Sequence, residues 1–326
     1  MPSTKQTKKT KIAILGGGPS GLFLFKKLLA TDNTELEIDI FERSNQLGAG
    51  MPYSCTGANN EHITNVSENE IPELVTSITA WAKTLPTAEL SKYNIDPDHF
   101  NEYKVLPRLF FGMYLSAQFE LLLKRAKENG VLTTVHLNSE VEDIIDRPEL
   151  NETWVDVAEI GICKFDAVVV CTGHSWPKIH EGKVEGYFDS PYPPSKLNLH
   201  LNHPVALRGS SLTAIDAIRT IARNNGRFFK DKDQKLAYLV ANDSPNFKIV
   251  MHTRSGMLPA VRFHLDDSHL SNESLLTEAE IAEHIKQNNG FLSLDFIFEK
   301  DFKDVFRDKD PQFYEQIKDM QIEDFV

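Results

Sequence analysis

The chain runs KIAILGGGPSG from Lys11 to Gly21, an apolar stretch followed directly by a glycine-rich turn. The apolar stretch predicts a short buried strand, and apolar residues recur at helical spacing over residues 22–29. Pro19 suits the first turn of that helix. A strand, a glycine turn and a helix therefore follow one another in the order that a pyrophosphate-binding βα unit requires.

Each glycine of this turn has its own expected task. Gly16 makes the tight turn, Gly18 lets the backbone approach a pyrophosphate, and Gly21 allows the helix to pack closely on the strand. A second strand predicted over residues 35–41 ends at Glu42, 21 residues after Gly21. A carboxylate at that position accepts hydrogen bonds from ribose hydroxyls. The alternative is a glycine turn that serves packing alone.

A second glycine turn begins at Gly209, 193 positions after the first, and again follows an apolar run. Ser210 and Ser211 replace the glycines that give the closest backbone approach, although a pyrophosphate can still meet the helix N-terminus. A phosphate-free turn is the alternative. The next strand ends near Arg254 without an acidic residue, so a guanidinium is present for a 2'-phosphate. The sequence predicts two dinucleotides, the second being NADPH rather than NADH.

The segment KFDAVVVCTG, residues 164–173, resembles the ATG signature of two-dinucleotide flavoproteins. Together with the first turn, this resemblance implies FAD as the first cofactor, with Thr172 and Gly173 beside it. Further stretches resemble the FAD/NAD(P)-binding protein family, which shares a fold with flavin monooxygenases and with bacterial lysine and ornithine N-hydroxylases. They are residues 48–54, 62–66, 106–115, 212–216 and 254–259.

The resemblance also implies individual site residues. It places His62 and Asn65 near the isoalloxazine ring, where an imidazole or an amide can hydrogen-bond the ring or a substrate, and Val141 near the adenine. Ordering of the loop and ordinary strand packing are the alternatives. Arg108 begins a predicted helix, where the dipole disfavours a cation unless an FAD phosphate or the acid of a surface ion pair lies nearby.

These considerations define one predicted set of residues. His62 and Asn65 are the catalytic candidates, and the sequence predicts no metal site. The predicted cofactor-binding residues are Gly16, Gly18, Pro19, Ser20, Gly21, Glu42, Arg43, Arg108, Val141, Thr172, Gly173, Gly209, Ser210, Ser211 and Arg254.

Two departures from the resembling families bear on function. Residues 186–192 read GYFDSPY, so the histidine-containing fingerprint of flavin monooxygenases and Baeyer-Villiger enzymes is not found there. Related flavoproteins also return after the NAD(P)H domain to complete the FAD domain, whereas an acidic tail follows residue 264 here. A truncated chain, a short family member and one part of a larger assembly all remain open.

The expected fold class is α/β, with two Rossmann-like dinucleotide-binding domains and a small antiparallel β-meander. We expect a helix over residues 76–85, another over 107–129, and short strands over 131–135, 141–145, 154–158 and 164–170. These strands form the meander and lead to a buried strand at Ala167–Val170. The predicted divisions are a disordered basic tail (1–10), an FAD-binding domain (11–185), an NAD(P)H-binding domain (200–264) and an acidic, partly helical extension (265–326).

Composition narrows the function classes. The net charge of −12 argues against nonspecific binding of nucleic acid or an anionic membrane. Three cysteines form no CxxC pair, which excludes a thioredoxin-reductase-like disulfide. No signal peptide or membrane span is evident, so we expect a cytoplasmic protein.

The sequence therefore predicts an NADPH-dependent FAD oxidoreductase, with a flavin hydroxylase as one form of it, acting on an unspecified small molecule. An additional domain or protein partner would complete the flavin site. The alternative is a non-catalytic dinucleotide-binding or regulatory module, or one part of a larger flavoenzyme.

Overall fold

The computed structural model describes residues 9–31, 33–96, 100–254, 256–258 and 276–325. Most of the predicted basic tail and the predicted boundary at residues 264 and 265 lie outside these residues. The chain divides into two compact units, Met1–Arg262 and Phe263–Val326.

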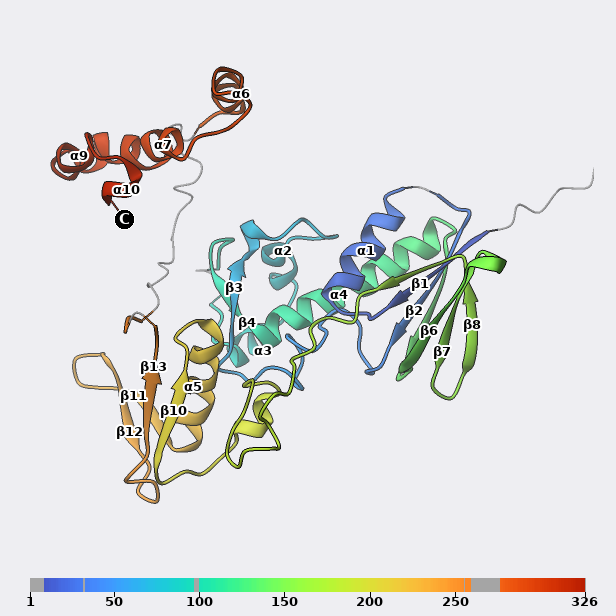
Figure 1. The fold of residues 1–326 in the computed structure, drawn as a ribbon, viewed down its shortest axis with the longest axis horizontal. Coiled ribbons are helices and arrows are strands. Elements are labelled where there is room, and N and C mark those ends of the chain that lie inside the picture. The colour runs from blue at the N-terminus through green and yellow to red at the C-terminus, as the bar shows by residue number, and fades with distance from the viewer. Residues whose placement is uncertain (1–8, 32, 97–99, 255, 259–275, 326) are drawn as a thin grey trace, which may run out of the picture. The chain divides into compact units, whose positions relative to one another are not determined.

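A four-stranded parallel sheet organises the first unit (Figure 1). Its order is β5-β2-β1-β9, which places the first strand between the second and the last, as in a Rossmann fold. The strands are β1 (Thr10–Leu15), β2 (Leu36–Glu42), β5 (Leu132–Leu137) and β9 (Ala167–Val170). The expected α/β fold class is thus confirmed.

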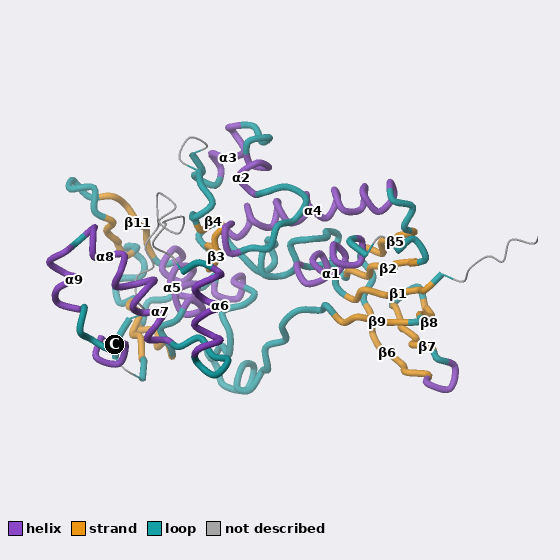
Figure 2. Tube along the Cα trace, turned by 90° about the horizontal axis from the view of Figure 1, so that it is seen from above, coloured by secondary structure: helices purple, strands orange, loops and turns teal. Residues whose placement is uncertain are grey.

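Helices pack against one face of this sheet and antiparallel strands against the other, as Figure 2 shows. Helices α1 (Pro19–Leu29) and α4 (Arg108–Glu128) pack against the face that carries Ile14 and Ile38. The antiparallel strands β6 (Val141–Arg147), β7 (Glu152–Val157) and β8 (Gly161–Phe165) pack against the face that carries Leu15 and Phe41. Successive residues of a strand point to opposite faces, so one apolar run supplies two cores.

Two expectations about the strands were wrong. Residues 132–137 do not belong to the meander but form β5 of the parallel sheet, because the preceding helix α4 carries the chain back to lie beside β2. The meander consists of β6, β7 and β8. The short helix η3 (Pro148–Leu150) connects β6 to β7, a short turn before Gly161 connects β7 to β8, and β8 leads to β9. Strand β9 was expected to be buried, but Val169 and Val170 are 36% and 59% exposed. Within the described chain β9 pairs with β1 alone, and it therefore forms an edge of the sheet.

The irregular segment between β2 and α4 contains short elements. Strands β3 (Ile63–Ser67) and β4 (Val105–Pro107) pair with each other, and η1 (Glu68–Glu70) follows β3. The helix expected over residues 76–85 is shorter, α2 (Ile78–Ala82), with Ser77 capping its N-terminus. Helix α3 (Thr87–Lys92) was not predicted and starts directly after Pro86.

The remainder of the first unit is a smaller βα arrangement with its own core. Strands β10 (Pro204–Arg208) and β13 (Lys248–His252) are parallel, and α5 (Leu212–Asn224) follows β10. The core joins Leu197, from η4 (Pro194–Leu197), to Ala217, Ile221 and Phe247. The hairpin of β11 (Gly226–Lys230) and β12 (Leu236–Val240) lies between α5 and β13 and was not predicted.

The second unit is helical where it is described. It contains α6 (Glu278–Gln287), α7 (Leu294–Ile297), the π-helical η6 (Phe298–Lys303), α8 (Asp304–Lys309), α9 (Pro311–Ile317) and α10 (Ile322–Phe325). Phenylalanine rings pack together inside it, with Phe302 in contact with Phe298, Phe306 and Phe325. None of the helices in the described ranges is both long enough and apolar enough to span a membrane.

Candidate functional site

A cleft of about 890 Å³ lies at the carboxyl ends of β1, β2 and β9, beside the N-terminus of α1. In open α/β sheets this edge is where ligands bind, and the volume lies in the upper part of the ~300–1,000 Å³ range of cofactor sites. The predicted cofactor-binding residues that line it are Gly16, Gly18, Pro19, Ser20, Glu42, Arg43, Val141, Thr172 and Gly173.

The first glycine turn is built by close backbone contacts. Gly16 has a φ of +105°, and a Cβ there would lie 2.5 Å from the carbonyl oxygen of Cys171. A Cβ on Gly21 would overlap the carbonyl oxygen of Gly16, which agrees with the expected close packing of helix on strand. A Cβ on Gly18 would lie 3.3 Å from the Cα of Gly50, so this glycine lets two cleft-lining backbones approach each other.

Glu42 both lines the cleft and holds the glycine turn. Its side chain is 8% exposed, and its Oε2 accepts a hydrogen bond of 2.9 Å from the backbone N–H of Gly17. Its Oε1 accepts one of 2.9 Å from the N–H of Ser44. Each carboxylate oxygen can accept a second hydrogen bond, so both atoms can still bind ribose hydroxyls. The contact with Gly17 was not predicted, because the spacing of the motif does not show where the acid points.

The N-terminus of α1 is suited to a phosphate. The first amides of a helix have no partner within it, and the N-cap residue Gly18 has no side chain to satisfy them. The first turn carries no acidic residue, so its positive dipole end is not neutralised. Together with Glu42, this helix end fits the diphosphate and ribose of a dinucleotide.

One part of the cleft lining is aromatic. His174, Trp176 and Tyr192 line it, with ring centroids 6.0 Å apart for His174 and Trp176 and 5.4 Å apart for Trp176 and Tyr192. These residues were not among the predicted ones. For His174 and Trp176 the available signal was their position, one and three residues after Gly173.

Arg108 has a buried carboxylate partner on α5. Its Nη2 lies 2.7 Å from Oδ2 of Asp216, and the two side chains are 15% and 5% exposed. Its Nη1 donates to the hydroxyl of Tyr192 at 3.1 Å, and its Nε donates to the carbonyl of Ile63 at 3.0 Å. The anion that offsets the helix dipole is thus an acid of this chain, although the ion pair is buried rather than at the surface.

His62 contacts α5 and does not line the cleft. It is 1% exposed, its Nδ1 accepts from the N–H of Asn59 at 3.2 Å, and its Nε2 lies 2.9 Å from Oγ1 of Thr220. Because Nδ1 accepts, the ring proton lies on Nε2, which donates to Thr220. Burial lowers the pKa of His62 and keeps the imidazole neutral. Asn65, the other catalytic candidate, is an exposed residue of β3.

The second glycine turn has the expected backbone. Gly209 has a φ of +113°, and its N–H donates to the carbonyl of His252 at 2.9 Å, so the ends of β10 and β13 lie side by side. Ser211 precedes α5 without a side-chain capping hydrogen bond. Ser210 is half-buried and Arg254, two residues beyond β13, is exposed. The guanidinium of Arg254 is therefore two residues beyond the end of β13, and this strand end lies beside the end of β10, which leads into α5.

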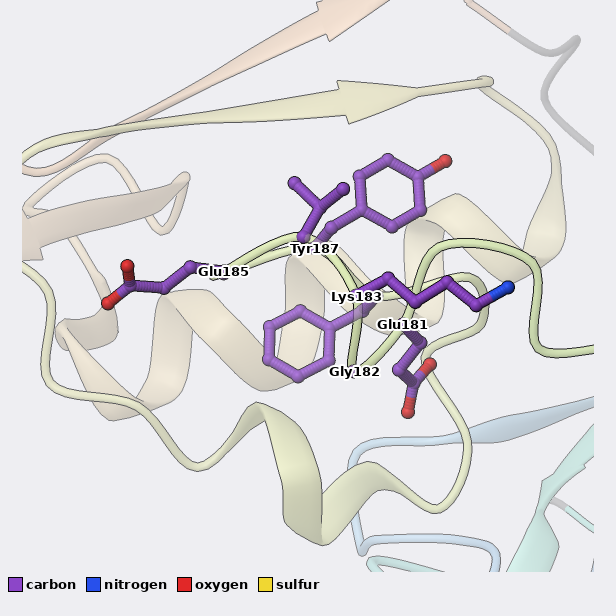
Figure 3. A pocket seen from close by; sticks show the side chains of 8 residues that line it. Glu181, Gly182, Lys183, Glu185 and Tyr187 are labelled. Carbon is purple, nitrogen blue, oxygen red and sulfur yellow. The ribbon is translucent and has the colours of Figure 1, made fainter.

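A second hollow, of about 410 Å³, belongs to one surface loop (Figure 3). Residues 181–188 alone line it, and the charged ends of Lys183 and Glu185 point away from each other. Asp189 braces the loop by accepting from the N–H groups of residues 179, 180 and 181. We therefore assign no ligand to it. The described residues also contain no group of three or more His, Cys, Asp or Glu side chains arranged to hold a metal ion.

Comparison with protein families agrees with the geometry of the cleft. Residues 13–175, half of the chain, match the family described as FAD-NAD(P)-binding. The chain belongs to this family. Residues 277–326, within the helical unit, match the YdhS-like middle domain.

Individual relatives extend the similarity. The uncharacterized protein YdhS of Escherichia coli (strain K12) is 28% identical over 285 residues, which are 86% of this chain and 52% of YdhS. Human dimethylaniline monooxygenase [N-oxide-forming] 4 is 29% identical over 188 residues, 53% of this chain and 29% of that protein. The chain thus spans about half the length of YdhS and less than a third of the human enzyme. It is an FAD/NAD(P)-binding protein similar to flavin monooxygenases, despite the absent fingerprint.

Two solved oxygenase structures are similar to part of this chain. Cyclohexanone monooxygenase in its open form superposes with a TM-score of 0.43 at 13% identity, over 67% of this chain and 38% of that enzyme. The S-allyl-L-cysteine S-oxygenase of Allium sativum gives a TM-score of 0.40 at 18% identity, over 66% of this chain and 49% of that enzyme.

Proposed function

We propose that this chain is an NADPH-dependent FAD oxidoreductase that holds FAD in the cleft at the carboxyl edge of the parallel sheet. The observation that carries the proposal is the joint placement of the α1 N-terminus, the Gly16–Ser20 turn and the buried carboxylate of Glu42 along one wall of that cleft. The diphosphate would meet the free amides of α1, and the ribose would bind Glu42.

The remaining contacts divide between the adenine and the flavin. Arg43 follows Glu42 directly, and Val141 lies two residues after Ser139, whose N–H donates to the carbonyl of Glu42. Arg43 and Val141 would therefore border the adenine, whereas Thr172 and Gly173 would border the flavin. A bound flavin supplies the redox chemistry, accepting a hydride and passing electrons on. The chain's own residues orient it and exclude water from it. An oxygen-using hydroxylase is the form of this activity that the similarity to flavin monooxygenases favours.

NADPH would bind at the second glycine turn. Its phosphates would meet the N-terminus of α5 after Ser211, and Arg254 would pair with the 2'-phosphate. Hydride transfer requires the nicotinamide in near contact with the flavin. The competing function is a non-catalytic binding module. Such a module needs the same nucleotide contacts, but it does not need the nicotinamide to lie against the flavin.

The decisive experiment is anaerobic reduction of the protein reconstituted with FAD. We expect NADPH to bleach the yellow absorbance and admitted oxygen to restore it. Stoichiometric FAD binding without any reduction by NADPH would contradict the oxidoreductase and leave the binding module. A peroxyflavin absorbance that persists after oxygen is admitted would support a hydroxylase, whereas rapid release of peroxide would support an oxidase.

A separate substitution tests the choice of nicotinamide cofactor. Arg254→Ala should weaken NADPH binding by about 1.5–3 kcal/mol, the scale of a charge-assisted hydrogen bond, and leave NADH binding nearly unchanged. Lys248→Ala, at the opposite end of β13, is the matched control for loss of an exposed cation. Equal losses for both nucleotides in Arg254→Ala would show that this arginine does not recognise the 2'-phosphate.

A further inference from the structure

The aromatic part of the cleft lining is built by one connection, which brings together two rings 16 positions apart in the sequence. Trp176 follows β9, and Tyr192 lies in the long connection toward β10, yet their ring centroids are 5.4 Å apart with an interplanar angle of 41°. Both line the same cleft as the glycine turn and Glu42. Trp176 is 39% exposed, so part of its ring surface is accessible to a ligand in the cleft.

The hydroxyl of Tyr192 is held by an ion pair. It donates to Oδ2 of Asp216 at 2.5 Å and accepts from Nη1 of Arg108 at 3.1 Å. Since Asp216 and Arg108 are themselves paired and nearly buried, these two side chains fix the orientation of the ring. A wall that is fixed at its polar edge and apolar on its face is suited to pack against a planar ring.

The cleft lining has a polar part and an aromatic part, and a dinucleotide has a polar part and planar rings. The N-terminus of α1 and Glu42 belong to the polar part. Arg43 follows Glu42 directly, and Ser139, two residues before Val141, donates its N–H to the carbonyl of Glu42. If the adenosine ribose of a dinucleotide binds Glu42, its adenine lies near Arg43 and Val141. The second ring system of the dinucleotide then extends past Thr172 and Gly173 toward Trp176. Within the proposed function, that ring system is the isoalloxazine.

We propose that Trp176 and Tyr192 form the stacking wall for the flavin ring, and that the Arg108–Asp216 pair is the positioning element that holds Tyr192 in that wall. This inference rests on the proposed binding of FAD in the cleft. It adds a recognition surface for the flavin ring that does not depend on the glycine motif, and it assigns Arg108 and Asp216 to the wall rather than to the phosphates.

The wall can be tested by fluorescence, independently of catalysis. An excited flavin in contact with an indole or a phenol is quenched by electron transfer, so the flavin emission per bound FAD should be low in the wild-type chain. At saturating FAD, Trp176→Ala should raise this emission severalfold. The dissociation constant of FAD should rise by about two- to tenfold, the range of an aromatic pair contact. The amount of bound FAD is measured separately, from its absorbance after gel filtration.

The matched control is Trp154→Ala. Trp154 lies on β7, where it contacts Arg147 and Lys164 instead of the cleft. The Trp154→Ala variant should leave both the flavin emission per bound FAD and the dissociation constant of FAD unchanged. Tyr192→Phe keeps the ring but removes both hydrogen bonds, so the flavin emission lifetimes should become longer and more heterogeneous while FAD remains bound.

The outcomes separate the two levels of the proposal. Bound FAD whose emission is the same in the wild type and Trp176→Ala would overturn the stacking wall and leave the FAD site intact. Lifetimes in Tyr192→Phe identical to the wild type would overturn the positioning role of Arg108 and Asp216. A wild-type chain that binds no FAD would overturn the proposed function, and the wall with it.

Discussion

Among single residues, Glu42 has the most demanding role, because one carboxylate serves both the fold and the proposed ligand. It holds the N–H groups of Gly17 and Ser44 while facing the cleft. Glu42→Ala should therefore weaken FAD binding by ~1–2 kcal/mol for each ribose hydrogen bond lost. Isothermal titration calorimetry measures this loss. Glu37→Ala, on the same strand but paired with Lys11, is the control, and equal affinities in the two variants would contradict the assignment.

His62 gives a prediction about pH. Burial lowers the pKa of this imidazole, while an unfolded histidine takes up its proton near pH ~6.5. The unfolded chain therefore binds more protons than the native chain just below that pH. The free energy of unfolding should fall as the pH drops from above ~6.5 toward the lowered pKa of His62, with a slope of at most ~1.4 kcal/mol per pH unit.

His62→Gln should remove this part of the pH dependence. The amide can still accept from Asn59 and donate to Thr220, so its effect on packing should be small. Urea unfolding at several pH values between about 7.5 and 5.5 measures the difference in slope. A variant with the same slope as the wild type would show that the neutral imidazole is not the group responsible.

Among the elements, α4 and α5 are joined by the Arg108–Asp216 ion pair. Removing one partner of a buried pair leaves the other charge unpaired, so Asp216→Ala should destabilise the first unit by ~3–5 kcal/mol. The double variant Arg108→Ala/Asp216→Ala should cost less than the sum of the two single changes. Glu128→Ala, which removes an exposed partner of Lys124, should cost ~0.5 kcal/mol or less. Additive costs for the buried pair, measured by denaturant unfolding, would contradict the coupling.

The same elements show how far the sequence predicts this structure. The first strand, turn and helix could be predicted because their signals are local: an apolar run, glycines at fixed spacing and a proline in the first turn of the helix. Strand β5 was assigned to the wrong sheet because its residues fit either neighbour, and only the packing of α4 decides between them. The spacing of a motif likewise cannot show that Arg108 meets Asp216, since 108 residues separate them along the chain.

The candidate site divides in the same way. Gly16, Gly18, Pro19 and Ser20 of the glycine turn were predicted and line one cleft together with Glu42 and the Thr172-Gly173 pair, whereas Gly21 does not line it. The aromatic wall was not predicted, because Trp176 and Tyr192 meet through the path of a long connection that carries no periodic pattern. Whether the predicted residues bind their cofactors stays a prediction that the experiments above test.

For the molecule as a whole, the described cleft belongs to one compact unit. All of its lining residues lie between Leu15 and Pro193, whereas the second unit begins at Phe263. From Ser271 to Val326 the chain has 14 Asp or Glu and 6 Lys or Arg residues, a net charge of −8 that accounts for most of the total. A separate family similarity, to the YdhS-like middle domain, also covers residues 277–326. FAD binding should therefore depend on the core of the first unit and not on that of the second.

Two phenylalanine substitutions in the full chain test this independence. Phe298 is 6% exposed in the second unit, and Phe25 is a fully buried residue of α1 in the first. Either change to alanine should cost about 3–5 kcal/mol of local stability. We expect Phe298→Ala to leave the dissociation constant of FAD unchanged and Phe25→Ala to raise it, because α1 carries the phosphate-binding amides. A clear loss of FAD affinity in Phe298→Ala would show that the acidic unit helps to complete the flavin site, as the additional-domain hypothesis requires.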